Sequence, residues 1–115
     1  MSVQAAKTSE NRIEATSPYW QIGIDLSRGG AIDSIVFPHG SGDNLVVSPF
    51  RTSVDEAQDI AGPAMDSTIE QTDRGVRIVC MGYLNKSDGS ADGVRYKHVY
   101  EIDDDIFLIR TTLTF

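Results

Sequence analysis

Apolar and polar residues alternate with a period of two along most of this sequence. In residues 19–26, Trp20, Ile22, Ile24 and Leu26 alternate with polar or small residues. This period places every second side chain on one face of a β-strand, so we expect that face to meet a core. The same pattern predicts further strands over residues 31–37, 44–47, 67–72, 76–84, 94–102 and 106–115.

Turn residues separate the predicted strands. Gly29 and Gly30 tolerate positive φ and join residues 19–26 to residues 31–37 as a hairpin, and three aspartates at 103–105 form another turn. Residues 48–66 follow neither period and are predicted to be a long connection. No window favours a long amphipathic helix. We therefore predict an all-β protein, an antiparallel β-sandwich assembled from hairpins.

The chain has room for one domain. Residues 1–17 contain few bulky apolar side chains and are predicted to be a flexible leader, and residues 18–115 are predicted to form the sandwich. The sequence ends at Phe115 inside an alternating strand pattern, which leaves a sheet edge to be covered. We expect either the remainder of a longer chain or a partner in a homo-oligomer.

The amino-acid composition narrows the classes of partner that we expect for this chain. Acidic residues outnumber basic ones, 17 to 10, and the net charge of −7 argues against nucleic acid, which requires clustered Lys and Arg. No apolar run approaches the roughly 20 residues of a membrane span, and the beginning lacks the features of a secretory signal. We expect a soluble protein without a membrane partner; its compartment stays open.

Two stretches carry a resemblance to a known family. The first reads Tyr19-Trp20-Gln21-Ile22-Gly23-Ile24-Asp25 and continues as Arg28-Gly29-Gly30-Ala31-Ile32-Asp33-Ser34-Ile35; the second runs from Val94 through Asp103-Asp104-Asp105 to Phe115. They resemble the opening hairpin, and the paired long strands around an acidic turn, of galactose-mutarotase-like β-sandwich domains. The resemblance implies that this chain is the N-terminal part of a larger two-sheet supersandwich.

That superfamily includes sugar epimerases and the sandwich domains of glycoside hydrolases and polysaccharide lyases, so the resemblance implies carbohydrate chemistry or its support. In the epimerases a His acts as general acid and a Glu as general base, but their motifs find no match here. No catalytic residue is carried over. The leading hypothesis is a carbohydrate-binding or scaffold segment; the alternative is a non-catalytic interaction module that completes its sheet by oligomerisation or strand addition.

The candidate carbohydrate site is a row of rings on one strand face. Tyr96, His98 and Tyr100 alternate along residues 94–102 and can stack on a sugar ring and bind its hydroxyls, with Arg51 of the long connection beside them. Ordinary packing between cross-strand neighbours explains the same row. Both interpretations stay open.

The other candidates have simpler interpretations. His39 lies in a turn and is expected to be exposed, Trp20 is expected in the core, and the single cysteine, Cys80, is expected to be a buried, inert thiol. The loop at residues 88–93 partly matches a calcium loop but lacks the bidentate acid, and residues 103–105 suffice as a turn. We therefore predict no metal and no cofactor.

Overall fold

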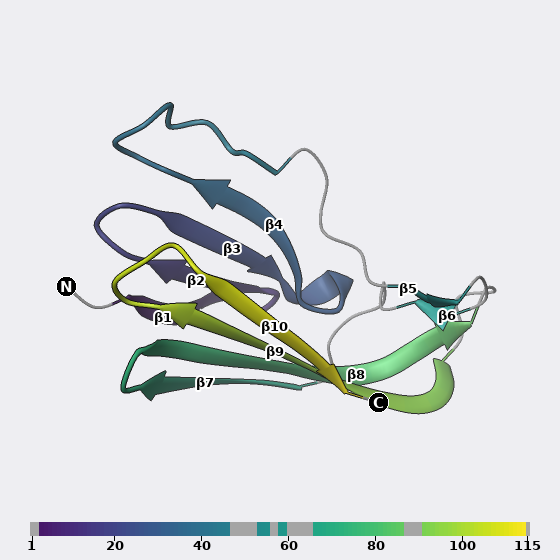
Figure 1. Cartoon of the computed structure of the whole chain (residues 1–115). Helices are drawn as coiled ribbons and strands as arrows, with labels where there is room; N and C mark the ends of the chain where they lie inside the picture. The colour runs from purple at the N-terminus through teal and green to yellow at the C-terminus, as the bar shows by residue number, and fades with distance from the viewer. Residues whose placement is uncertain (1–2, 47–52, 56–57, 60–65, 87–90, 115) are drawn as a thin grey trace.

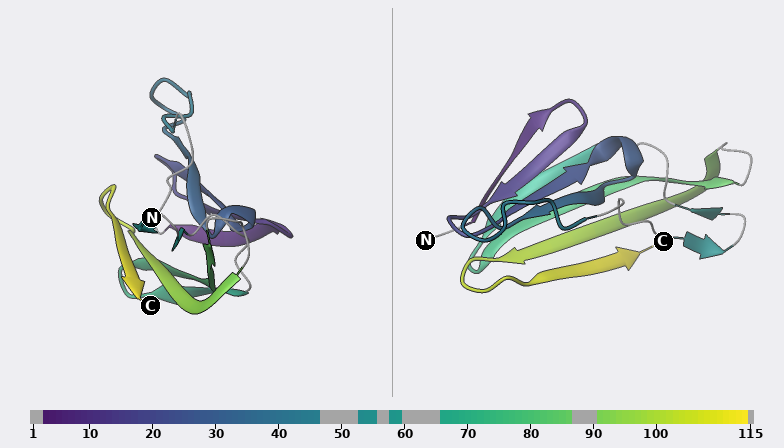
Figure 2. Two further views of the ribbon diagram at one scale, coloured as in Figure 1. Left: turned by 90° about the vertical axis from the view of Figure 1, so that its right-hand side faces the viewer. Right: turned by 90° about the horizontal axis from the view of Figure 1, so that it is seen from above.

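The fold is an antiparallel β-sandwich, as the alternation predicts. The computed structural model describes residues 3–46, 53–55, 58–59, 66–86 and 91–114. Two sheets lie face to face as separate layers (Figures 1 and 2). Among the described residues there is no helix long and apolar enough to cross a lipid bilayer.

Chain order explains the two layers. The four-stranded sheet takes its strands in sequence order and consists of β1 (Gln4–Ser9), β2 (Arg12–Thr16), β3 (Gln21–Asp25) and β4 (Ala31–Val36). The six-stranded sheet has the order β10-β9-β8-β6-β5, with β7 also paired to β8. Its strands are β5 (Ser53–Asp55), β6 (Gln58–Asp59), β7 (Asp66–Thr72), β8 (Gly75–Lys86), β9 (Ala91–Asp103) and β10 (Ile109–Thr114).

The core lies between the sheets, and the alternating residues supply it. Its buried cluster takes Val3, Ile13, Ala15, Trp20, Ile22, Ile24, Leu26 and Ile32 from the first layer, and Val76, Ile78, Cys80, Tyr100 and Ile102 from the second. On β8 the inward side chains are Val76, Ile78 and Cys80, so the predicted burial of Cys80 is confirmed. Each fully buried isoleucine stabilises the fold by about 1.5–3 kcal/mol.

An aromatic contact closes the core near the β9–β10 connection. The ring of Phe107 lies 5.9 Å from that of Trp20 and 5.0 Å from that of Phe37, in edge-to-face arrangements. Such pairs add to the stabilisation from burial alone. Trp20, whose side chain is buried, is thus a core residue, as predicted.

The turn after β3 forms as its glycines predict. A short 3-10 helix, η1 (Leu26–Arg28), is capped by the Asp25 side chain and ends at Gly29. Gly29 and Gly30 have φ of 72° and 80°, the left-handed region that side chains disfavour. A Cβ on Gly30 would lie 2.7 Å from the Cys80 sulfur. Gly30 is therefore required both by its backbone angles and by the close approach of the opposite sheet.

The structure differs from prediction at residues 1–17. Instead of a loose leader, residues 4–16 form the hairpin β1–β2, and Ile13 and Ala15 are fully buried. Cross-strand pairing explains the difference, because Ile13 faces Ile24 and Ala15 faces Ile22 on β3. A few inward side chains suffice when a neighbouring strand supplies the rest of the core.

Two other segments refine the prediction. The predicted strand at 44–47 is a single bridge between Val36 and Asn44 in the part that the structure describes; residue 47 lies outside it. Short strands β5 and β6 form within the predicted connection, where β8 and β9 extend beyond the four-stranded sheet (Figure 1). The rest of residues 48–65 lies outside the described residues.

Candidate functional site

The predicted carbohydrate row lies on the inner face of β9. Tyr96, His98 and Tyr100 have exposed fractions of 2%, 8% and 3%. Their cross-strand partners on β8 are Gly82, Cys80 and Ile78, in that order. The row therefore points into the sandwich, and Arg51, the fourth predicted residue, lies outside the described residues.

Tyr100 joins the two sheets. Its hydroxyl donates a 2.6 Å hydrogen bond to the Gly30 carbonyl oxygen in the turn that follows η1. Burial, followed by the proximity of Cys80 and Tyr96, raises the pKa of Tyr100. The hydroxyl thus stays protonated and remains a donor to Gly30, which is a structural task.

His98 is held by its neighbours. Its Nε2 lies 2.5 Å from the Thr111 hydroxyl on β10, and its ring centroid lies 4.4 Å from that of Tyr100. Burial lowers the pKa of His98, which favours the neutral imidazole. A neutral ring between a hydroxyl and an aromatic side chain is well suited to packing.

Tyr96 is buried, and its hydroxyl has no hydrogen-bond partner among the described residues. A Cβ at Gly82 would lie 2.9 Å from the tyrosine ring and hydroxyl, so a glycine there leaves room for this side chain. Burial, with a smaller contribution from Cys80, raises the pKa of Tyr96 to about 12. Packing thus accounts for the whole row, and sugar contact at these residues stays a prediction.

His39 and Cys80 have the environments expected of them. His39 is exposed in its turn. Cys80 is buried, and burial raises the pKa of its thiol to about 12, so the nucleophilic thiolate is suppressed at neutral pH. Among the described residues, no group of three or more His, Cys, Asp or Glu side chains is placed to hold a metal ion. Residues 88–90 of the partial calcium loop lie outside that set.

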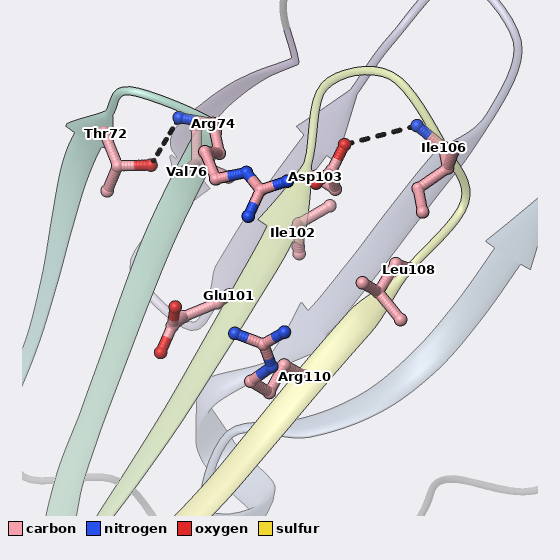
Figure 3. A pocket seen from close by; sticks show the side chains of 9 residues that line it. All are labelled: Thr72, Arg74, Val76, Glu101, Ile102, Asp103, Ile106, Leu108 and Arg110. Atoms are coloured by element: carbon pink, nitrogen blue, oxygen red, sulfur yellow. Dashed lines mark hydrogen bonds between the residues drawn. The ribbon is translucent and has the colours of Figure 1, made fainter.

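A hollow lies at the end of the six-stranded sheet where two hairpin turns meet (Figure 3). It is lined by Thr72, Arg74, Val76, Glu101, Ile102, Asp103, Ile106, Leu108 and Arg110. In Figure 3 the guanidinium groups of Arg74 and Arg110 lie at opposite ends, with Glu101 on one side and Leu108 on the other. Ile106 and Leu108 have exposed fractions of 59% and 40%. The hollow therefore combines charged groups with accessible aliphatic surface.

Backbone hydrogen bonds fix the shape of this hollow. The Asp104 N–H donates to the Arg74 carbonyl at 2.7 Å and ties the two turns together. Asp103 Oδ1 accepts the N–H groups of Asp105 and Ile106 at 2.8 and 3.2 Å. These bonds, with smaller effects of Arg74 and Arg110, lower the pKa of Asp103, so its carboxylate is charged at neutral pH. The backbone of the two turns and the Asp103 carboxylate are thus held in place by bonds within the chain.

The hollow was not among the sites predicted from the sequence, although strand order contains a signal for it. In a meander, the turns after the first and third strands lie at the same end of the sheet. The turns at 73–74 and 104–108 are related in this way through β8 and β9. Arg74 and the acidic turn could therefore have been expected to be neighbours.

Comparison with known proteins gives no relative for this chain. No protein-family description, no curated protein and no solved structure matches it.

Proposed function

We propose that this chain is a carbohydrate-binding scaffold segment of a galactose-mutarotase-like protein and that its sugar lies in the hollow between Arg74 and Arg110. One observation carries the proposal: two guanidinium groups, two carboxylates and exposed aliphatic side chains line the same hollow. Sugars present hydroxyls that donate and accept hydrogen bonds around a ring with apolar C–H faces. A site with polar groups placed beside apolar surface matches that chemistry.

The inner face supports the scaffold part of the proposal. Tyr100 bonds the Gly30 carbonyl and His98 lies against Thr111, so these potentially reactive groups stabilise the sandwich. Both side chains are buried, whereas the hollow has exposed side chains, so we place the sugar in the hollow. The function is accordingly binding, with no acid or base assigned to this chain.

The proposal is tested by NMR titration of the ¹⁵N-labelled chain with a panel of mono- and oligosaccharides. We expect shifts concentrated in the amides of residues 72–76 and 101–110. Arg110→Gln should abolish them, because it removes a charged donor from the hollow. Arg95→Gln is the matched control, since Arg95 is an exposed arginine of the same sheet outside the hollow. No shift across the panel, or shifts located elsewhere, would remove the proposal.

A second function, strand addition, is favoured by the contrast between two sheet edges. The outer edge of β4 is covered: the Leu45 N–H bonds the Ile35 carbonyl, and the Asn44 side chain bonds both the Ile35 N–H and the Asp33 carbonyl. β10 ends the order of the other sheet, and within the described residues no strand covers its outer edge. Such an edge is a template for another strand.

For this second function we propose a second copy of the chain as the partner. Light scattering over a range of protein concentrations should then detect a dimer, and Thr112→Lys on β10 should shift it toward monomer by placing like charges at the joined edges. Thr68→Lys, at an exposed position of β7, is the control. A monomer at every concentration would exclude strand addition between copies.

A further inference from the structure

We infer that Glu101 restricts the hollow to neutral sugars and excludes sugars that carry a carboxylate. This inference rests on the proposed function, because it names the class of sugar that the same hollow takes. Its starting point is the charge of the lining: Arg74 and Arg110 supply +2, Glu101 and Asp103 supply −2, and the sum is zero. Thr72 and the aliphatic residues add no charge.

Glu101 keeps its negative charge available to a ligand. It is exposed, and its cross-strand neighbours are Arg77 on β8 and Arg110 on β10. Among the described residues, however, the ion pairs within 4.0 Å involve only Arg12 and Arg28. The Glu101 carboxylate therefore lies near cations of its sheet without a direct ion pair that would occupy its oxygens.

The two acids of the hollow differ in their freedom. Asp103 uses Oδ1 to accept two backbone N–H groups and thereby shapes the turn. Glu101 is on the regular part of β9 and has no such task among the described residues. A substitution that removes the charge at residue 101 therefore leaves the bonds that shape the turn in place, so Glu101 is the residue at which the charge of the hollow can be tested.

A neutral pyranose matches this arrangement better than a uronate does. Neighbouring hydroxyls can donate to a carboxylate and accept from a guanidinium, so all four charged side chains gain partners. The carboxylate of a uronate would gain from Arg74 or Arg110 but would meet Glu101 and Asp103 in a chain with a net charge of −7. Juxtaposed like charges are a common means of rejecting a wrong ligand.

The test compares neutral methyl glycosides and oligosaccharides with the corresponding uronates, using the wild-type chain and Glu101→Gln. The substitution changes the charge of the hollow from 0 to +1. We expect the wild type to bind only the neutral series, and Glu101→Gln to improve the ratio of uronate to neutral affinity by about tenfold or more, a change of about 1.4 kcal/mol.

Glu70→Gln is the matched control. Glu70 is exposed, also faces Arg77 across a strand pair, and lies outside the lining of the hollow. It changes the net charge of the chain by the same amount, so it should leave the affinity ratio unchanged. An equal change in both variants would assign the effect to overall charge and overturn the role of Glu101.

The remaining outcomes separate the two claims. If the wild type binds uronates as well as neutral sugars in the hollow, the inference about Glu101 is wrong and carbohydrate binding stands. If sugars of neither class shift the amides of the hollow, the proposed function itself fails.

Discussion

The two faces of β9 hold titratable side chains in opposite environments. On the inner face Tyr96, His98 and Tyr100 are buried. Burial raises the pKa of the two tyrosines and lowers the pKa of His98, which favours the neutral form of each side chain. On the outer face Glu101 is exposed, and Asp103 has its pKa lowered mainly by backbone hydrogen bonds. One strand thus supplies neutral groups for packing and charged groups at the surface, and its alternation keeps them apart.

The substitution at the inner face that should lower the unfolding free energy most is Gly30→Ala. The new alanine would have φ near +80°, and its Cβ would contact Cys80. Backbone strain and overpacking together should lower the unfolding free energy by about 3 kcal/mol. Urea unfolding, followed by the fluorescence of the single tryptophan, measures it. Gly42→Ala is the control: Gly42 has φ of 76°, but no atom of the described residues lies within 4 Å of the new Cβ. It should lose only about 1–2 kcal/mol, and equal losses would argue against the inter-sheet contact.

A smaller effect on the unfolding free energy is expected to distinguish the two buried tyrosine hydroxyls. Tyr100→Phe removes the donor to the Gly30 carbonyl and should cost about 1–3 kcal/mol of unfolding free energy. Tyr96→Phe removes a hydroxyl that finds no partner in the described part of the chain, so it should be neutral or stabilising. The two urea midpoints compare them directly. A loss on Tyr96→Phe as large as that on Tyr100→Phe would contradict this difference.

The mildest change is the pH dependence that His98 gives to stability. Its ordinary pKa is 6.5, and burial lowers the pKa in the folded state. Between these two values the unfolded chain binds more protons, so the unfolding free energy rises with pH. The contribution is complete above pH 6.5 and is lost as the pH falls from 6.5 through the folded-state pKa.

Unfolding curves at a series of pH values check this dependence. His98→Gln should flatten the slope below pH 6.5, whereas His39→Gln, which changes the exposed histidine, should leave it as it is. If His98→Gln retains the full slope, another group causes it.

Alternation and turn chemistry were enough to predict much of the fold. They place β3, β4 and β7–β10, the left-handed turn at Gly29 and Gly30, and the burial of Cys80, because these depend on local periods and backbone angles. They failed for β1–β2, because the burial of Ile13 and Ala15 depends on partners elsewhere in the chain. The composition of a segment does not show which strand it pairs with.

The site was harder to predict, for a physical reason. A strand pattern shows that Tyr96, His98 and Tyr100 share a face, but it does not say whether that face is covered. Here the face is covered: all three side chains are buried, and the Tyr100 hydroxyl bonds the Gly30 carbonyl in the turn between β3 and β4. The hollow depends on two turns that meet through strand pairing and on the bond from Asp104 to Arg74, neither of which appears in a local sequence window.

Asp104 gives the molecule a junction between three remote segments. Its backbone N–H holds the Arg74 carbonyl, and its carboxylate accepts the Val3 N–H at 2.6 Å. Detachment of the first strand therefore releases one support of the turn beside the hollow. Any molecule that steadies this turn will, by thermodynamic reciprocity, also slow the peeling of β1 from the sandwich.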